Sequence, residues 1–175
     1  MIEKEKYEEC KARALEYFEK AAIAVSARER SELEVADFGL GRIDEFGVEL
    51  IIMVNTERVS AKEVVLFPGQ ICPQHYHPDM KGIKGKEETF RCRWGQMYLY
   101  TEGEPSPSPR ARVPQDKEDV FTLWREHVLN PGDCITIYPG TPHWFQAGPE
   151  GAVFSEFGTH NDDRFDVFLD PEIVR

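Results

Sequence analysis

The chain has 175 residues, of which 41% are hydrophobic, 11% aromatic and 30% charged, a composition typical of a folded globular protein and unlike that of a disordered or fibrous one. Its 32 acidic and 21 basic side chains give a formal net charge of -11. Because such a charge repels phosphate backbones and anionic lipid, nucleic acid and membrane surfaces are not expected as partners. A chain of this length is expected to form one domain with a substantial core.

The amino terminus, "MIEKEKYEEC", is highly charged and contains no apolar stretch typical of a signal peptide. No later apolar run reaches the length of a membrane span. The four cysteines are scattered and form no C-x-x-C pair: Cys10, Cys72, Cys92 and Cys134. These features together predict a cytoplasmic protein whose cysteines are reduced and mostly buried.

The first predicted element is one helix over residues 2–25. Apolar side chains recur there at spacings of three and four, with Glu and Lys between them: Tyr7, Cys10, Ala14, Tyr17, Phe18 and Ala21. Residues 37–47, "DFGLGRIDEFG", contain three glycines and no period, which indicates a connecting loop. We therefore expect a helical extension over residues 1–35, followed by a different architecture over residues 36–175.

Short β-branched and aromatic runs separated by Gly and Pro follow along the rest of the chain. Strands are predicted at residues 48–54, 62–67, 89–100, 120–124, 127–130, 133–138, 143–147 and 152–157. Many short strands at close spacing indicate an all-β sandwich or barrel behind the single helix. Residues 102–119 hold four prolines and no core pattern, so they are predicted to be a long loop that is either mobile or laid over the surface.

A histidine pair in "QICPQHYHPD" is the first sign of a functional site. Side chains at i and i+2 of a strand share a face, so His75 and His77 would point to the same side. Glu88 opens the strand after the 78–87 loop, and His143 opens another strand after the Pro-Gly turn at residues 139–140. Three imidazoles and one carboxylate suit Mn, Fe, Co, Ni or Zn better than Ca or Mg. The alternative is that these histidines are ordinary core or surface residues.

The surrounding sequence resembles the cupin family. The first motif of that family is Gly, five residues, His-x-His, a gap, Glu, six residues and Gly. In this chain it resembles the run from Gly69 through His75, His77 and Glu88 to Gly95, and the six-residue step before Gly95 selects Glu88 over Glu87. "GDCITIYPGTPHWF", which contains His143, is similar to the second motif. The gap before Glu88 is longer than usual, one Gly-to-Pro spacing differs by a residue, and Ala147 stands where asparagine is common. These departures do not affect the four candidate ligands.

Three longer segments resemble the D-lyxose ketol-isomerases, a manganese-dependent branch of the cupins: residues 36–78, 85–100 and 156–166. The resemblance implies a cupin jelly-roll β-barrel that holds Mn²⁺ through His75, His77, Glu88 and His143, with Co²⁺, Fe²⁺, Ni²⁺ or Zn²⁺ as possible replacements. It also implies interconversion of D-lyxose and D-xylulose through a metal-bound cis-enediol, with D-mannose and D-fructose as a secondary pair.

Two residues are expected to do the proton chemistry. Glu156 lies in the apolar run "AVFSEFG", where a buried carboxylate is costly unless it is paired or functional, and it matches the acid that opens the family pattern E-x-x-x-x-N-D-D-x-x-D. Lys62 opens the strand leading to the histidines and matches a family active-site lysine; otherwise it would be a surface lysine at a strand end. Either a proton or a hydride could move between C1 and C2.

Substrate contacts are expected from Asp166, the last acid of that pattern, and from Lys86, two residues before Glu88. A solvated loop lysine is the alternative for Lys86. Asp162 and Asp163 are interpreted as turn residues, and His127 and His160 are given no site role. Trp144 and Phe145, next to His143, are interpreted as core packing.

Alternative functions use the same cage: a sugar-phosphate isomerase, a dioxygenase, or a sugar-binding cupin without catalysis. A phosphate substrate needs a cationic cluster, for which Arg91, Arg93 and Lys62 are the candidates. A net charge of -11 gives no attraction for a dianion, so a free, neutral sugar fits better. A homodimer is implied by the resemblance, because cupins commonly pair through strand edges that must be covered.

Overall fold

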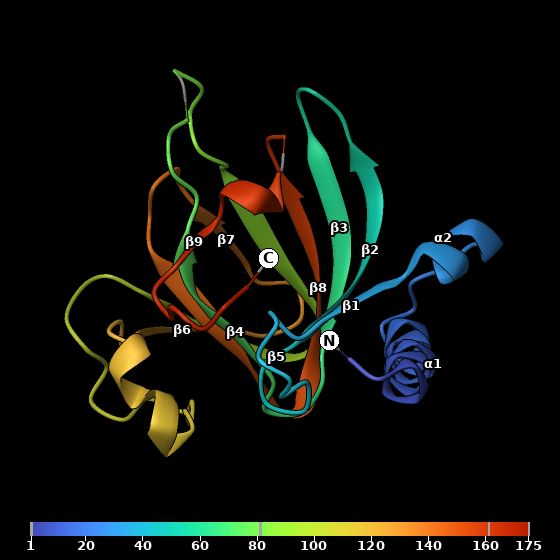
Figure 1. The fold of residues 1–175 in the computed structure, drawn as a ribbon, viewed down its shortest axis with the longest axis horizontal. Helices are drawn as coiled ribbons and strands as arrows, with labels where there is room; N and C mark the ends of the chain where they lie inside the picture. The colour runs from blue at the N-terminus through green and yellow to red at the C-terminus, as the bar shows by residue number, and fades with distance from the viewer. Residues whose placement is uncertain (1, 81, 161, 175) are drawn as a thin grey trace.

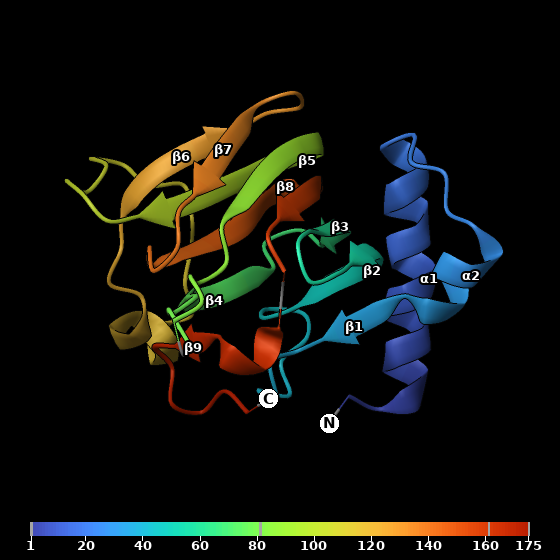
Figure 2. The same cartoon turned by 90° about the horizontal axis from the view of Figure 1, so that it is seen from above.

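The computed structural model describes residues 2–80, 82–160 and 162–174. A curled antiparallel sheet forms a half-barrel, and one long helix packs on its outside (Figures 1 and 2). The elements run, in chain order, α1 (Lys4–Lys20), α2 (Ala27–Glu32), β1 (Glu34–Ala36), β2 (Val48–Asn55), β3 (Ser60–Leu66), β4 (Ile71–Tyr76), β5 (Glu88–Thr101), the 3-10 helix η1 (Gln115–Val120), β6 (Arg125–Leu129), β7 (Cys134–Ile137), β8 (His143–Gly158), the 3-10 helix η2 (Asp163–Phe165) and β9 (Val167–Phe168). The predicted all-β cupin-like fold with an N-terminal helix is confirmed.

Helix α1 forms because its apolar residues lie on one stripe. Cys10, Ala14, Tyr17 and Phe18 are buried against the outer face of the sheet, where they meet a second apolar cluster that includes Val65. The helix is shorter than the predicted 2–25: Ala22 has a φ of 56°, in the left-handed region, which ends the helical path. A second short helix then starts at the capping box formed by Ser26 and Glu29.

The long strands β5 and β8 build the half-barrel. They pair antiparallel along nearly their whole length, from Glu88 opposite Gly158 to Thr101 opposite His143. On its other edge β8 pairs with β4 through its first half and with β3 through its second half. One continuous strand therefore connects both sides of the curled sheet and brings the starts of β5 and β8 to the same cavity.

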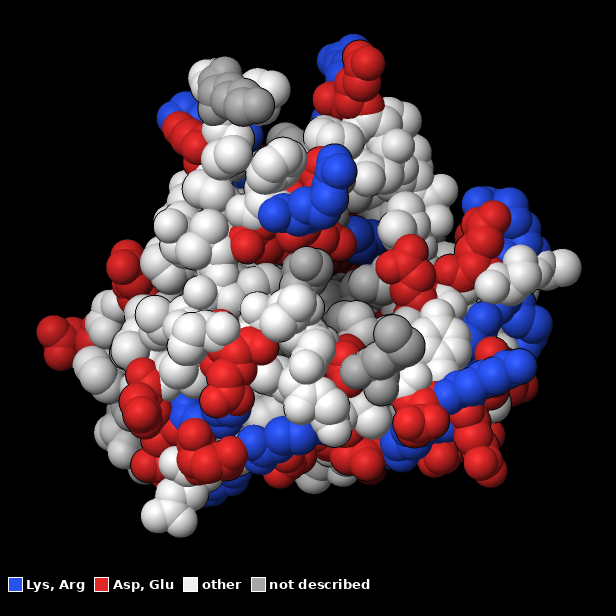
Figure 3. All heavy atoms as spheres, in the orientation of Figure 1, with Lys and Arg blue, Asp and Glu red and all other residues white. Residues whose placement is uncertain are grey.

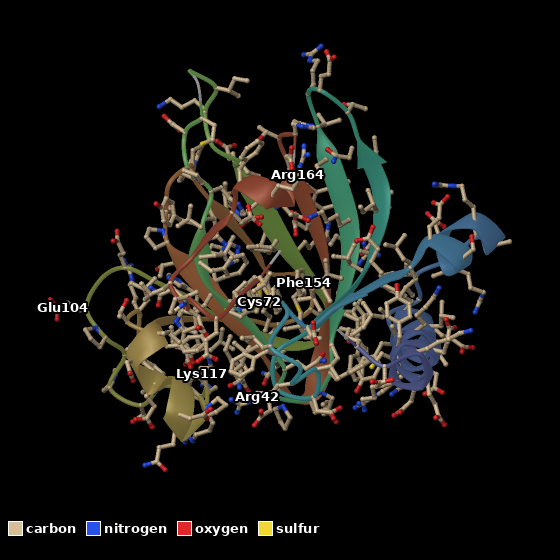
Figure 4. All side chains as sticks on the ribbon, viewed as in Figure 1. Arg42, Cys72, Glu104, Lys117, Phe154 and Arg164 are labelled. Carbon is tan, nitrogen blue, oxygen red and sulfur yellow. The ribbon has the colours of Figure 1, made fainter. Side chains whose placement is uncertain are left out.

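The main hydrophobic core fills the interior of the half-barrel. Side chains from the inner faces of β4, β5 and β8 pack there, including Cys72, Phe90 and Phe154. Figure 4 shows Cys72 and Phe154 in the middle of the barrel. Three cysteines are buried and the fourth, Cys134, is exposed. In the described part of the chain, no helix has both the length and the apolarity needed to cross a membrane.

Two strand predictions are wrong in informative ways. The strand predicted at residues 120–124 is absent: Val120 ends η1, and residues 121–124 are irregular chain. Their aromatic side chains fix the segment to the core, where Phe121 packs on Trp144 with ring centroids 4.7 Å apart. The runs 143–147 and 152–157 are one strand, β8, because the Gly-Pro segment between them bulges out without ending the pairing. The short strands β1 and β9 were not predicted, and β1 starts slightly before the expected boundary at residue 36.

The proline-rich segment is attached to the rest of the molecule. Ala111 is buried in the core, and its backbone N–H donates a hydrogen bond of 3.0 Å to the Tyr100 hydroxyl. Lys117, on η1, is also buried, with 6% of its surface exposed. This part of the chain therefore lies over the surface and packs into it, as one of the two predicted alternatives had it.

Candidate active site

Four side chains with metal-binding chemistry meet inside the barrel. His75 comes from β4, His77 follows that strand directly, and Glu88 and His143 are the first residues of β5 and β8. The antiparallel register places His75 opposite His143. One ligand atom from each of the four lies within 4.8 Å of those of the others, and all four residues are buried. These are the four residues that the spacing of the two histidine motifs had brought together.

The histidine rings are oriented by hydrogen bonds at their outer nitrogens. Nδ1 of His75 lies 2.8 Å from the Pro73 carbonyl oxygen, and Nδ1 of His143 lies 3.0 Å from that of Thr141. Because a carbonyl oxygen can only accept, Nδ1 of both rings carries the proton. Nε2 is then left with its lone pair for a metal, the arrangement typical of metal-binding histidines.

The interior of this cluster fits a divalent cation. Nε2 of His143 is completely buried and, although it lies 2.9 Å from Glu88 Oε1, its geometry gives it no hydrogen-bond partner. A buried polar atom of this kind is costly unless another ligand satisfies it. Among the described residues, the cavity is lined by two lysines and four carboxylates, Glu88, Glu156, Asp163 and Asp166. A divalent cation would balance the resulting formal charge of -2.

A buried ion-pair network joins the cluster to the predicted base. Lys86 Nζ donates to Glu88 Oε2 at 2.5 Å and also to Glu156 Oε1, which makes it a bridge between the two carboxylates. Lys62 approaches the same Glu156 oxygen at 3.7 Å and Asp163 Oδ1 at 3.5 Å. Lys86 is 8% and Lys62 4% exposed, so neither is the solvated lysine of the alternative interpretations.

The protonation equilibria reflect this packing. Burial would raise the pKa of Glu88, but the nearby Lys86 ammonium holds it well below its usual range. Burial, with help from the neighbouring His143 and His77, lowers the pKa of His75 well below 6.5. Burial opposes protonation of His77 as well, yet hydrogen bonds to Asp166 and Glu88 raise its pKa to about 9. The cluster thus favours a positive charge beside Glu88.

The cavity around the cluster is small and has an outer continuation. The inner space measures about 60 Å³, with apolar walls that include Val64, Phe90 and Phe145. A second hollow of about 210 Å³ shares His77, Lys86 and Asp166 with it and extends beneath the 78–87 loop and the η2 segment. Figure 3 shows a notch in the outline of this face between the two segments that project at the top, with acidic and basic atoms on the surface below it.

The structure also shows where four other residues lie for which predictions were made. Asp166 reaches the site, with Oδ1 2.6 Å from His77 Nδ1. Asp162 caps η2, in keeping with its interpretation as a turn residue. His160 is exposed, and Nδ1 contacts the Thr56 carbonyl oxygen at 2.8 Å. His127 contacts Thr101 away from the cluster.

Two residues at the site were missed. Asp163 was interpreted as a turn residue, but it lines the cavity and pairs with Lys62. Phe168 stacks on the His75 ring with centroids 5.1 Å apart. The local sequence marks neither residue, because each reaches the site only through a tertiary contact with a residue about a hundred positions earlier in the chain. Trp144 is fully buried in the core, as predicted.

Together the fold and the site define a cupin-like barrel with a candidate divalent-metal centre beside a buried carboxylate. The family model of the D-lyxose isomerases matches residues 16–175. The chain is 51% identical over 175 residues to a D-lyxose ketol-isomerase of a Thermofilum species and, likewise, to the D-lyxose/D-mannose isomerase of Thermosediminibacter oceani; each match covers the whole chain and 97% of the relative. The chain belongs to the D-lyxose isomerase family, and it is a sugar isomerase.

Solved structures support the fold independently. The L-ribose isomerase of Cellulomonas parahominis without ligand superposes with a TM-score of 0.81 at 17% identity, covering 98% of this chain and 94% of that one. The L-ribose isomerase of an Acinetobacter species in complex with L-ribose gives 0.80 at 15% identity with the same coverage. At this identity the likeness concerns the fold alone.

Proposed function

We propose that this protein interconverts D-lyxose and D-xylulose, and more slowly D-mannose and D-fructose, with Mn²⁺ held by His75, His77, Glu88 and His143. The observation that carries the proposal is the convergence of these four buried ligands within 4.8 Å, with Glu156 tied to the same site through Lys86. A relative 51% identical over the whole chain is named for both D-lyxose and D-mannose. Co²⁺, Fe²⁺, Ni²⁺ or Zn²⁺ would suit the same donor set.

The chemistry assigned to the chain is a proton transfer. Glu156 takes the proton from C2 of the open-chain aldose and returns it to C1 of the resulting cis-enediol, while a proton passes from O2 to O1. Lys62, near Glu156, donates a hydrogen bond to a sugar oxygen at the reacting end. A divalent cation in the cluster would polarise the carbonyl and stabilise the negative charge that develops on the oxygens.

Two features support a free sugar as substrate. Arg91 and Arg93 are exposed, and the Arg93 guanidinium donates to Ser155 on the outer face of the sheet, so they offer no phosphate site beside the cluster. The two lysines in the cavity are already paired with carboxylates. We propose that the reacting end of the sugar occupies the inner space and its far end the outer hollow, because the inner space of about 60 Å³ is too small for a whole sugar and the two spaces adjoin at His77, Lys86 and Asp166.

We further propose that the chain acts as a single cupin domain in a cytoplasmic homodimer, with Lys86 in contact with substrate. The scattered cysteines, which form no C-x-x-C pair, support a reducing compartment. Short edge strands such as β1 leave backbone groups that a second copy would cover. Light scattering would test the dimer: a monomeric mass at working concentration would contradict it.

The test is turnover by EDTA-treated protein on a panel of free aldoses, with and without Mn²⁺. Conversion of D-lyxose to D-xylulose only after metal is restored, with other sugars slower, is the expected result. Sugar phosphates and oxygen consumption are measured on the same samples. Turnover of a sugar phosphate, or oxygen uptake in place of isomerisation, would replace the proposal with one of the other cupin chemistries; binding of sugar with no turnover would make the protein a sugar-binding cupin.

A further inference from the structure

The three candidate histidine ligands are not held in the same way. His75 and His143 each contact a carbonyl two residues earlier in their own segment, so their support is local. His77 Nδ1 instead contacts Asp166 Oδ1 at 2.6 Å, across 89 residues of sequence. Both side chains of this pair are 6% exposed. One metal ligand therefore depends on a carboxylate from the C-terminal segment.

That segment is fastened to the barrel directly after the contact. Directly after Asp166, strand β9 pairs with β4, and Phe168 lies opposite His75 in register and stacks on its ring. The next residue, Leu169, donates its backbone N–H to the Gln74 carbonyl oxygen at 3.0 Å. The strand that carries the histidine pair and the segment that carries Asp166 are thus locked to each other.

A buried ion pair then fixes the end of the segment to the proline-rich region. Lys117 Nζ on η1 donates to Asp170 Oδ2 at 2.7 Å, and these side chains are 7% and 4% exposed. Figure 4 places Lys117 between η1 and the body of the barrel. The chain just after η1 also holds β4, because Gln74 and Thr122 exchange two hydrogen bonds of 2.9 and 2.8 Å. Residues 115–122 therefore bind both the strand that leads to His77 and the segment that follows Asp166.

We infer that Asp166 is a positioning residue, which holds the His77 ring so that Nε2 faces the metal, and that the Lys117–Asp170 pair fastens the segment that delivers it. Carboxylate partners of metal-bound histidines fix the tautomer and raise the basicity of the ligating nitrogen. The inference rests on the proposed metal site. It departs from a role for Asp166 in binding substrate, because it predicts that metal affinity, and not substrate affinity, is what Asp166 controls.

The experiment is titration of EDTA-treated protein with Mn²⁺, following the free ion by electron paramagnetic resonance. Asp166→Asn should weaken Mn²⁺ binding roughly 10- to 100-fold, the usual cost of removing such a partner. Turnover at saturating Mn²⁺ should largely return, with KM for sugar little changed. Asp163→Asn is the matched control: it removes a carboxylate from the same cavity that pairs with Lys62, and should leave Mn²⁺ affinity close to that of the unaltered protein.

Asp166→Asn with unchanged Mn²⁺ affinity and a raised KM would overturn the inference and make Asp166 a substrate ligand. Failure of the unaltered protein to bind Mn²⁺ would overturn the metal site itself, and the inference with it. If Asp166→Asn does not fold, nuclear magnetic resonance of the Zn²⁺-loaded, unaltered protein decides: the Nδ1 proton of His77 should appear downfield and exchange slowly. Fast exchange of that proton would contradict a held His77 ring.

Lys117→Met tests the fastening separately, since it touches neither the ligands nor the cavity. It should lower Mn²⁺ affinity by less than Asp166→Asn, and Lys117→Arg should restore it because the guanidinium can reach the same carboxylate. Equal affinity in Lys117→Met and in the unaltered protein would separate the ion pair from the metal centre and overturn this half of the inference.

Discussion

At the scale of single residues, Glu156 combines burial with two cationic neighbours. It is 8% exposed, receives a hydrogen bond from Lys86 and lies 3.7 Å from Lys62. The two ammonium groups hold this carboxylate at the edge of the ligand cluster. It is therefore already in place to accept a proton from a bound sugar. Its position, and not its burial alone, distinguishes it from the other acidic residues of the chain.

Glu156→Gln should therefore reduce kcat by about two to four orders of magnitude, the usual contribution of general acid–base catalysis, while metal content stays full. The amide keeps the size of the side chain but cannot accept the C2 proton. Glu87→Gln is the control, since Glu87 is exposed and adjacent to the ligand Glu88. Steady-state rates and metal analysis on the same preparations check this; turnover retained in Glu156→Gln would remove the residue from the mechanism.

A site residue can be predicted from the sequence only where its local pattern reflects its place in the fold. The ligands were predictable because the spacing of His75, His77 and His143 relative to glycines and prolines reflects strand and turn geometry. Asp163 and Phe168 were not, since both come from the C-terminal segment and contact β3 and β4 only after folding. Lys86 and Asp166 were predicted to bind substrate, and their direct contacts in the structure are to Glu88, Glu156 and His77.

At the scale of elements, the contact between α1 and the outer face of the sheet contains an acidic group. Glu49 on β2 is fully buried, and one of its oxygens, Oε2, has no hydrogen-bond partner. Burial raises the pKa of Glu49 to about 8. The folded state thus favours the neutral carboxyl, whose contribution to stability is complete below the unfolded pKa of about 4.5 and is lost as pH rises towards 8.

Glu49→Gln should consequently stabilise the protein at pH 8 and above, and progressively less as pH falls to about 4.5. A pKa shift of this size corresponds to at most about 5 kcal/mol in the free energy of unfolding, and relaxation of the site would reduce this to a few kcal/mol. Chemical denaturation across this pH range measures it. Glu34→Gln, an exposed site on neighbouring β1, controls for loss of one negative charge. A difference between Glu49→Gln and the unaltered protein that does not vary with pH would contradict a buried neutral acid.

Most elements were predictable because their patterns are local. The stripe of α1 and the β-branched runs of β2, β3 and β5 agree with the observed elements within a few residues. The failures share one cause: tertiary contacts replaced local signals. Phe121 and its neighbours are apolar because they anchor a loop on Trp144, and the Gly-Pro bulge inside β8 resembles a turn while pairing continues on both sides.

At the scale of the whole molecule, the fold serves to bring distant segments to one cavity. The register of β5, β8 and β4 places the four ligands together, and the C-terminal segment crosses the mouth of the barrel to reach His77 (Figures 1 and 2). The formal net charge is -11, and the face drawn in Figure 3 carries charges of both signs, whereas the cavity pairs each of its lysines with carboxylates. A neutral sugar needs no long-range attraction to enter such a site.

The most direct measurement of the central claim is a titration of EDTA-treated protein with Mn²⁺ in which bound metal and D-lyxose conversion are followed together. Both should rise in proportion and level off at one ion per chain. His143→Gln should abolish both, whereas His127→Gln, which alters a histidine outside the cluster, should change neither. Full conversion of D-lyxose by metal-free protein, or by His143→Gln with no bound Mn²⁺, would contradict the account.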